Sequence, residues 1–286
     1  MTDRRPRPVS TTIRSQGARR RRSPKTGGLP VVLVLPAVVG LAFLLVPMAG
    51  LLLEAPWGTL GTRLADPAVL AALRLSLLTA SVATALCLVW GVPLAWLLAR
   101  SALPGRQYIR ALVTVPLVLP PVVGGVALLL VLGRNGVIGQ YLESWFGVSL
   151  PFTTAGVIVA EAFVAMPFLV IAVDGALRGA DRRYEEAAAT LGASQWLTFR
   201  RVTLPLVAPG IAAGAVLCWA RALGEFGATI TFAGNLPGKT QTMPLAVYLA
   251  LNTDPQAAIV LSLVLLAVSV IVLASLRDKW ISPNAA

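Results

Sequence analysis

Six uninterrupted runs of apolar residues dominate the sequence, and each is long enough to cross a lipid bilayer as a helix, which takes about 20 residues. None of them alternates apolar with polar residues, as the strands of a membrane barrel would. The sequence therefore predicts an all-α fold, a polytopic helical membrane protein with six transmembrane helices. The runs are roughly Leu29–Leu53, Val69–Ala99, Ile109–Leu132, Thr154–Leu177, Leu206–Leu223 and Ala257–Leu276.

The composition excludes several classes of protein. Only 13% of the 286 residues are charged, whereas a soluble domain carries about twice that share. The chain has no histidine and two cysteines, Cys87 and Cys218, each alone in an apolar run. That inventory supplies no metal-ligand cluster and no disulfide framework. It also offers no convincing nucleophile–base pair, so a membrane enzyme is disfavoured and we expect no catalytic residue, no metal and no cofactor.

The net charge of +12 raises the question of nucleic-acid binding, and the position of the charge argues against it. Nine of the 24 Lys and Arg lie in the first 25 residues, which contain no aromatic side chain to stack on bases. We interpret residues 1–28 as a disordered basic cytoplasmic tail that orients the chain in the lipid bilayer. We expect no nucleic-acid partner.

The distribution of basic residues also predicts the topology. With the N-terminus inside, the inner segments hold 19 Lys and Arg and the outer segments hold four. Because cytoplasmic segments carry the excess of basic residues, both termini are predicted to be cytoplasmic. We expect a transmembrane domain over residues 29–280, with its core at about 65–276 and a polar cytoplasmic region at 181–203, followed by a short tail at 281–286.

The third apolar run is dense in Pro and Gly between Pro116 and Gly125. Each Pro frees a backbone carbonyl and bends a helix unless neighbours compensate. We expect this run to form a wall of a transport pathway.

One polar segment, Tyr184–Pro205, separates two apolar runs and lies in the cytoplasm by the charge count. Asp181 can cap a helix that begins near Arg182, and Gly192 can take the left-handed conformation that ends it. Ser194 can then cap a second helix that runs into the next span. We therefore expect a helix, a sharp turn, and a second helix rigidly joined to a transmembrane helix.

The first of these helices carries a small apolar stripe. Its members recur at i, i+3, i+4 and i+7 and so share one face; they are Tyr184, Ala187, Ala188 and Leu191. Such a face suits the groove of a partner protein. A helix lying on the bilayer surface is the alternative, and it is disfavoured because only Tyr184 and Leu191 are bulky enough to insert.

The same segment resembles the cytoplasmic signature of permease subunits of bacterial ATP-binding-cassette importers, which reads EAA, three residues, Gly, nine residues and Ile or Val-x-Leu-Pro. Here it is filled by Glu186, Ala187, Ala188, Gly192, Val202, Leu204 and Pro205. The resemblance implies the type I importer permease fold. It also implies a coupling helix, to which Tyr184, Glu185 and Leu191 belong, held in a cleft of a separate ATPase subunit. This chain has no phosphate-binding loop of its own.

A second stretch, residues 221–248, is similar to molybdate importer permeases. The segments Phe226-Gly-Ala-Thr229 and Thr240-Gln-Thr-Met-Pro244 favour that family over the related sulfate permeases. The resemblance implies import of molybdate, with tungstate as a second candidate, across a bacterial plasma membrane. It also implies a homodimer and an extracytoplasmic molybdate-binding protein. A sulfate or thiosulfate importer is the alternative.

Polar residues at membrane depth are costly and mark the candidate pathway. Arg221 and Glu225 lie four apart on a helix, which favours a structural or gating ion pair over direct contact with substrate. The resemblance places Thr229, Thr231 and Asn235 near an outer gate, where they can offer neutral hydrogen-bond donors to an oxyanion.

Two further acids lie in the fourth span. Asp174 can pair with Arg178 at i+4, whereas Glu161 has no evident partner in the sequence. A secondary transporter or channel, the alternative from another class, should show an intramembrane proton or sodium relay. The acids here are few and mostly near span ends, which favours the importer subunit.

Overall fold

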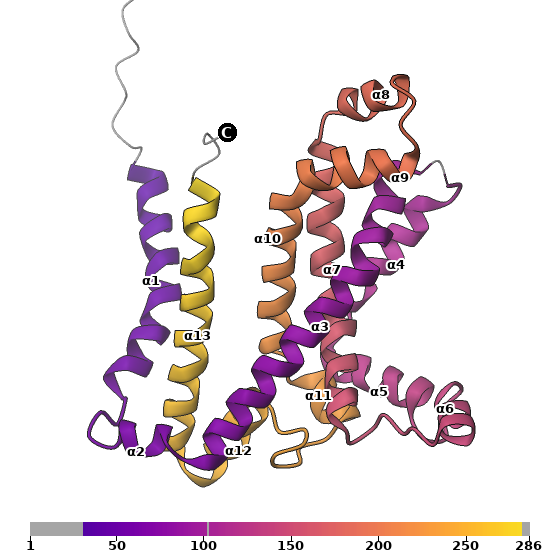
Figure 1. Ribbon diagram of the computed structural model, residues 1–286. Coiled ribbons are helices and arrows are strands. Elements are labelled where there is room, and N and C mark those ends of the chain that lie inside the picture. The colour runs from indigo at the N-terminus through magenta and orange to yellow at the C-terminus, as the bar shows by residue number, and fades with distance from the viewer. Residues whose placement is uncertain (1–30, 102, 282–286) are drawn as a thin grey trace, which may run out of the picture. The chain divides into compact units, whose positions relative to one another are not determined.

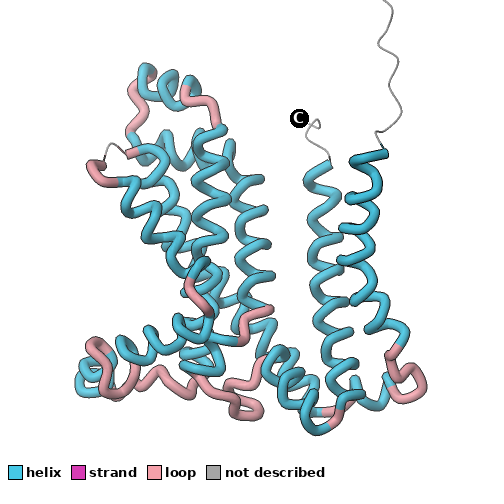
Figure 2. Tube along the Cα trace, turned by 180° about the vertical axis from the view of Figure 1, so that it is seen from behind, coloured by secondary structure: helices cyan, strands magenta, loops and turns pink. Residues whose placement is uncertain are grey.

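The structure is a computed structural model that describes residues 31–101 and 103–281, and every regular element in these ranges is a helix. The predicted all-α fold is thereby confirmed (Figures 1 and 2). The predicted basic tail, 1–28, and residues 282–286 of the predicted C-terminal tail lie outside the described residues.

The helices follow one another through short connections. Their bounds are α1 (Val31–Leu53), α2 (Leu60–Leu64), α3 (Pro67–Arg100), α4 (Arg106–Val118), α5 (Pro121–Leu132), α6 (Gly139–Phe146), α7 (Thr154–Gly179), α8 (Arg183–Thr190), α9 (Gln195–Thr198), η1 (Phe199–Thr203), α10 (Leu204–Leu223), α11 (Gly227–Phe232), α12 (Met243–Thr253) and α13 (Pro255–Ile281). The element η1 is a single π-helical turn.

The chain divides into two compact units. The first ends at Gly50 and holds most of α1, and the second runs from Leu51 onward and holds the other helices. Five helices of the described residues are long and apolar enough to cross a membrane: α1, α3, α7, the continuous helix that ends in α10, and α13. A bent pair, α4 and α5, passes the same test together and brings the number to the predicted six.

The core of the second unit lies where α3, α7 and α10 pack against one another. Small buried residues dominate it, including Ala80 and Ala83 of α3 and both free cysteines, Cys87 and Cys218. Small side chains let transmembrane helices approach closely, so that dispersion contacts hold them together where lipid offers no hydrophobic driving force. Both cysteines are therefore core residues.

The third apolar run departs from the predicted single span. We predicted one helix over Ile109–Leu132, whereas the structure has two helices, α4 and α5, bent by 113°. Leu119 between them is extended, with φ −67° and ψ 129°, because a following proline disfavours the helical conformation. Pro120 and Pro121 also lack the amide hydrogens that a continuing helix would need.

The half-helix α5 packs closely against α11. Gly125 is buried, and a Cβ atom there would lie 2.7 Å from Cβ of Thr231 and 2.9 Å from the carbonyl oxygen of Ala228. On the other side, a Cβ atom on Gly227 would lie 2.8 Å from Cβ of Pro121. The two short helices therefore touch backbone to backbone, and any side chain at either glycine would force them apart.

We predict that Gly125→Ala destabilises the membrane domain by about 1–3 kcal/mol, because the added methyl overpacks a backbone contact that cannot yield. Thermal unfolding of the detergent-purified protein checks this. Gly175→Ala is the matched control, since a Cβ atom on that glycine of α7 meets nothing within 4 Å. Equal unfolding midpoints for the two variants would contradict the close packing of α5 on α11.

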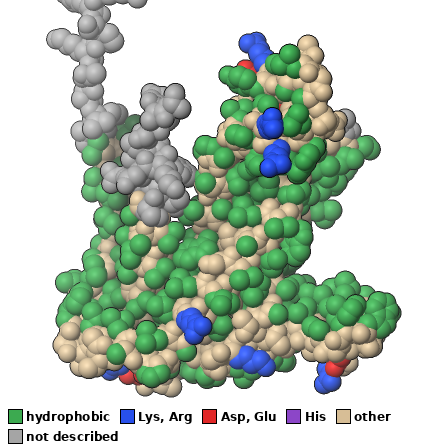
Figure 3. Space-filling view, viewed as in Figure 1, with side chains coloured by type: hydrophobic (Ala, Val, Ile, Leu, Met, Phe, Trp, Pro, Cys, Tyr) green, Lys and Arg blue, Asp and Glu red, His purple; other side chains and the backbone are tan. Residues whose placement is uncertain are grey.

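The basic side chains of the second unit gather at its two ends. In the space-filling view some lie over α8 and α9, and others lie near α6 and α12 at the opposite end, with a hydrophobic band between them (Figure 3). This is the distribution expected for a helix bundle that crosses a bilayer, whose apolar core is about 30 Å thick.

An ion pair joins α2 to the start of α13 at one of these ends. Nη1 of Arg63 lies 2.6 Å from Oδ2 of Asp254. The hydrogen bond from Arg63, with those from the amides of Ala257 and Gln256, lowers the pKa of Asp254 below its ordinary value. The pair therefore stabilises the fold above the unfolded-state pKa of about 3.9, and this contribution is lost as the pH falls through the lowered pKa.

We predict that Arg63→Gln returns the pKa of Asp254 to its ordinary range, because the main stabilising partner of the carboxylate is removed. A carboxyl carbon-13 NMR titration of aspartate-labelled protein measures this directly. Arg74→Gln, which removes an exposed charge from α3, should leave the titration unchanged. An unaltered pKa in Arg63→Gln would show that the ion pair is absent in solution.

Candidate functional site

The helix α8 begins where the sequence predicts. The amide of Arg183 donates to Oδ1 of Asp181 at 2.9 Å, so Asp181 satisfies one of the amides that a helix leaves free at its start. Glu185 and Glu186 lie in the first turn, where their negative charge suits the positive end of the helix dipole. The expected start of the helix is confirmed.

A left-handed turn at Gly192, with φ +81°, ends α8. The amide of Gly192 donates to the carbonyl of Ala189 at 3.0 Å, and the amide of Ala193 donates to the carbonyl of Ala188 at 3.0 Å. This pair of bonds is the Schellman motif, in which glycine is favoured because it tolerates positive φ without strain. Gly192 is thus the turn that the sequence predicts.

Ser194 starts the second helix, as predicted, since its Oγ accepts a hydrogen bond from the amide of Leu197 at 3.3 Å. The chain is then helical without a break through α9, η1 and α10. Leu204 and Pro205, which close the signature, are the first two residues of α10. The second helix is therefore joined directly to a transmembrane helix, which confirms that expectation. We call residues 181–203 the coupling hairpin.

The predicted apolar stripe faces solvent. Tyr184 is 60% exposed and Leu191 is 89% exposed, while Ala187 is exposed and Ala188 is half-buried. Glu186 is exposed as well. The stripe is therefore free within this chain to meet another protein.

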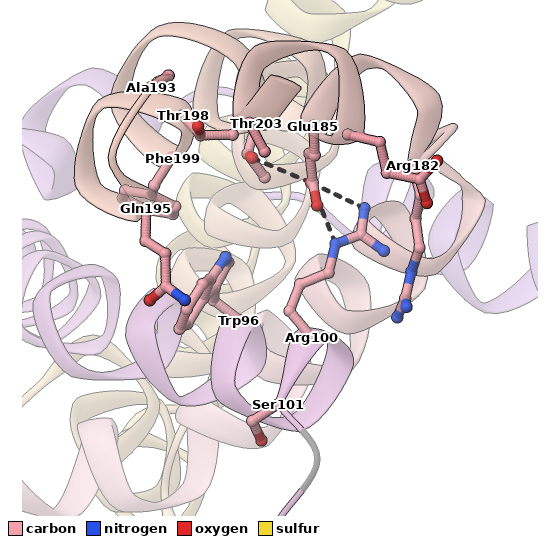
Figure 4. A pocket seen from close by; sticks show the side chains of 12 residues that line it. Trp96, Arg100, Ser101, Arg182, Glu185, Ala193, Gln195, Thr198, Phe199 and Thr203 are labelled. Carbon is pink, nitrogen blue, oxygen red and sulfur yellow. Dashed lines mark hydrogen bonds and ion pairs between the residues drawn. The ribbon is translucent and has the colours of Figure 1, made fainter. Parts of the chain in front are cut away.

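Glu185 points the other way, into the membrane domain (Figure 4). Its Oε1 accepts hydrogen bonds from Nε of Arg100, at the end of α3, at 3.1 Å and from Oγ1 of Thr203, at the end of η1, at 3.0 Å. Close by, Nη2 of Arg182 donates to the carbonyl of Ala99 at 3.2 Å. The first turn of α8 is thus fastened to two transmembrane helices.

A cavity of about 500 Å³ lies between α8 and the ends of α3 and η1. Its lining mixes charge with aromatic surface, and it includes Trp96, Arg100, Arg182, Glu185 and Phe199. The rings of Trp96 and Phe199 meet edge to face, with centroids 5.9 Å apart. The coupling hairpin therefore covers a cavity.

The predicted pair of Arg221 and Glu225 forms at the far end of α10. Nη1 of Arg221 lies 2.6 Å from Oε2 of Glu225, whose side chain is 1% exposed. Oε1 of Glu225 also accepts a hydrogen bond from the amide of Ala228 at 2.8 Å. The carboxylate therefore holds the break between α10 and α11, which supports the structural or gating interpretation of this pair.

Glu161 of α7 lies in the same buried region. Oγ1 of Thr79, on α3, donates to its Oε1 at 2.9 Å, and Glu225 lies close enough to interact with it electrostatically. Oε2 of Glu161 is buried without a hydrogen-bond partner among the described residues. The partner that the sequence did not reveal is thus a threonine 82 positions away.

The three neutral pathway candidates occupy different environments. Thr229 is fully buried on α11, and its hydroxyl has no hydrogen-bond partner among the described residues. The hydroxyl of Thr231 donates to the carbonyl of Gly227 at 2.8 Å. Asn235 lies in the loop after α11, and its Oδ1 is buried, likewise without a described partner. Thr229 and Asn235 therefore each bury an oxygen atom without a described partner, whereas the hydroxyl of Thr231 is satisfied within its own helix.

Asp174 pairs with Arg178 as predicted. It has a second partner, since Nη2 of Arg110 on α4 lies 3.0 Å from its Oδ1. The sequence missed that contact, as it missed Arg100 and Thr203 around Glu185. The only signal for these residues was a basic or hydroxyl side chain at the end of an apolar run.

The sequence matches the family described as "Binding-protein-dependent transport system inner membrane component" over residues 91–284. The chain belongs to this family. The coupling hairpin and the buried region around Glu225 both lie inside the matched residues.

Curated relatives cover most of the chain. The "Molybdenum transport system permease protein ModB" of Mycobacterium tuberculosis is 48% identical over 244 residues, which is 85% of this chain and 92% of the relative. ModB of Escherichia coli is 42% identical over 211 residues, 74% of this chain and 92% of the relative. The "Sulfate transport system permease protein CysT" of Escherichia coli is 38% identical over 238 residues, which is 82% of this chain and 86% of the relative.

Solved structures share the fold. A crystal structure of a bacterial ABC transporter involved in the import of the acidic polysaccharide alginate gives a TM-score of 0.70 at 18% identity and covers 89% of this chain and 96% of that chain. The alginate transporter in complex with an alginate pentasaccharide-bound periplasmic protein gives a TM-score of 0.68 at 19% identity, with 90% and 96% covered. The fold is therefore that of an ABC importer permease.

We predict that Gly192→Ala loosens the end of α8 by about 1–2 kcal/mol, the cost of a left-handed conformation for a residue with a Cβ atom. Space is not the cause, because a Cβ atom there meets nothing within 4 Å. Hydrogen exchange at the amides of residues 192 and 193 should speed up about 5- to 30-fold. Gly179→Ala, which also has open space around it, should leave these amides unchanged, and unchanged rates in Gly192→Ala would contradict the turn.

Proposed function

We propose that the chain is the membrane-spanning permease subunit of an ATP-driven importer that moves molybdate, or the similar tungstate, into the cytoplasm by alternating access. The observation that carries the proposal is the coupling hairpin, a rigid polar element. One face of its first helix is exposed, and its second helix continues into the transmembrane helix α10. Membership in the transport family supports the same role. The chain is then a transporter subunit, with ATP hydrolysis on a partner.

The exposed face of α8 is proposed to dock on a cytoplasmic ABC ATPase subunit. Tyr184 and Leu191 would fill apolar contacts, while Ala187 and Ala188 keep the helix close to the partner surface. Laying an amphipathic helix in a groove is a common mode of recognition. Gly192, Leu204 and Pro205 would then fix the direction in which a movement of the ATPase reaches the membrane. Glu186, exposed on the first turn, completes this surface.

The outer end of α10 is proposed as the gate. Arg221, Glu225, Thr229, Thr231 and Asn235 lie at or beyond that end, where α10 breaks and α11 begins. A tetrahedral dianion needs hydrogen-bond donors on its path without a deep charged trap, because tight binding would slow its release. A self-neutralised ion pair beside buried hydroxyl groups meets that requirement.

Molybdate is favoured over sulfate by sequence similarity, both overall and in two short segments. The relatives whose names refer to molybdenum are 48% and 42% identical to this chain, whereas the sulfate relative is 38% identical. The segments 226–229 and 240–244 also match molybdate permeases in sequence. A sulfate or thiosulfate importer remains the alternative substrate class.

The proposed assembly is a homodimer of this chain in a bacterial plasma membrane, with an ATPase on the cytoplasmic side and a molybdate-binding protein on the outer side. Support for the outer partner comes from the alginate transporter, which was solved with its periplasmic protein. The excess of basic residues on the α8 side supports cytoplasmic termini. A secondary transporter or channel would need none of these partners.

We predict that Glu186→Lys abolishes copurification of the ATPase and molybdate-dependent growth, while the variant stays in the membrane. Reversing the charge of an exposed residue disturbs the docking surface and leaves the buried core alone. Glu54→Lys, an exposed acid outside the coupling hairpin, is the control and should behave like the wild type. Normal copurification of the ATPase with Glu186→Lys would remove the docking role.

The substrate is tested separately. The binding protein that works with this chain should bind molybdate and tungstate more tightly than sulfate in a direct titration. A preference for sulfate would replace molybdate as the substrate and leave the permease role intact.

A further inference from the structure

The coupling helix α8 has almost no packing of its own with the membrane domain. None of its residues is buried, and a cavity of about 500 Å³ lies beneath it. Apolar packing therefore cannot be what transmits a force from α8 to the transmembrane helices. Apart from its two short chain connections to α7 and α9, α8 is held to the bundle by the polar contacts of its first turn.

Apart from the bond of Arg182 to the carbonyl of Ala99, those contacts converge on one oxygen atom. Oε1 of Glu185 lies 3.1 Å from both Nε and Nη2 of Arg100, and 3.0 Å from Oγ1 of Thr203. The close view shows the three side chains pointing toward one another across the edge of the cavity (Figure 4). A single carboxylate thus bridges three elements: α8, the end of α3, and η1.

Breaking the ion pair between Glu185 and Arg100 costs free energy because Arg100 is a buried cation. The side chain of Arg100 is 7% exposed and that of Glu185 is 20% exposed. Removing one member of a buried ion pair leaves the other charge uncompensated. Each charge also interacts favourably with the dipole of its helix, since Arg100 is the last residue of α3 and Glu185 lies in the first turn of α8. The pair should therefore persist when α8 is pushed.

The third partner lies in a π-helical turn. Thr203 is 1% exposed and closes the π-helical turn η1, directly before α10. A π-helical turn has a wider hydrogen-bonding pattern than the α-helix, and such turns occur frequently at functional sites. The bond from Thr203 therefore ties α8 to the π-helical turn at the base of α10.

Glu185 is linked through Arg100 to α3 and through Thr203 to α10, and both helices reach the proposed gate. The 20 residues of α10 span about 30 Å and end beside the pair of Arg221 and Glu225. The other helix, α3, carries Thr79, which bonds to Glu161 in the same buried region. Both helices thus run from the coupling hairpin to the gate.

We propose that Glu185, Arg100 and Thr203 form a joint through which α8 moves α3 and α10 together. They are positioning residues that do not touch the substrate, and Glu185 serves this joint and not the surface that meets the ATPase. The inference rests on the proposed function and deepens it. Docking belongs to the exposed stripe, and the joint adds a side-chain route to the route that runs along the chain through Gly192, Leu204 and Pro205.

The experiment measures molybdate transported per ATP hydrolysed in proteoliposomes that contain the whole complex. The main variant is the double substitution Arg100→Met with Glu185→Leu, because replacing both members of a buried pair by apolar residues is often neutral for stability. We expect it to retain the ATPase subunit and a normal unfolding temperature. The transport-to-hydrolysis ratio should fall about tenfold or more, which corresponds to losing charge-assisted hydrogen bonds.

A milder pair of variants separates coupling from folding. Thr203→Val keeps the shape of the side chain and removes the hydroxyl, so the ratio should fall about 2- to 10-fold. Thr203→Ser keeps the hydroxyl and should preserve the ratio. Arg183→Gln, which removes an exposed charge from the same helix, is the matched control and should also preserve it.

The outcomes distinguish the two proposals. If the wild-type complex shows no ATP-driven transport, the proposed function fails and the joint fails with it. If the wild type is coupled and the double variant keeps the same ratio, only the joint is overturned. If the double variant and Thr203→Val both unfold, the network serves folding alone, and if both stay folded but lose the ATPase subunit, it serves docking. Either result overturns the joint.

Discussion

Ion pairs between side chains withdrawn from water shape much of this structure, because a buried charge without a partner is costly. Asp174 is held by Arg110 and Arg178, Glu225 by Arg221, and Glu185 by Arg100. An unpaired charge at such positions would cost several kcal/mol. Each pair lies at the end of a transmembrane helix and fixes where that helix meets its neighbours. The ion pairs therefore lie at the two ends of the bundle, one beside α8 and the other at the end of α10.

The two ends are connected by continuous helices. The helix that begins in the coupling hairpin ends at the Arg221–Glu225 pair, and α3 passes through the same bundle from Thr79 to Arg100. The core between them is dominated by small residues, with several Leu and Val side chains, and packs closely. A close-packed bundle of this kind moves as a few rigid elements and does not deform smoothly. We expect a displacement of α8 to be expressed mainly at the π-helical turn η1 and at the break between α10 and α11.

Local features were predictable from the sequence, because each depends on residues near one another in the chain. The cap at Ser194, the turn at Gly192 and the pairing of Arg221 with Glu225 are set within five positions. Contacts between distant segments were not predictable. Glu185 meets Arg100 from 85 positions away, and only the fold brings them together. The prolines between α4 and α5 predicted that the helix would bend there. The size of the bend was not predictable, because it depends on how α5 packs on α11.

The proposed function is inward transport of an oxyanion driven by ATP. Uptake of radioactive molybdate measures it directly, in proteoliposomes that contain the chain with the proposed ATPase and binding protein. We expect accumulation above the external concentration only when ATP is supplied on the ATPase side and the binding protein is loaded. Accumulation without ATP, driven by a proton or sodium gradient, would contradict it.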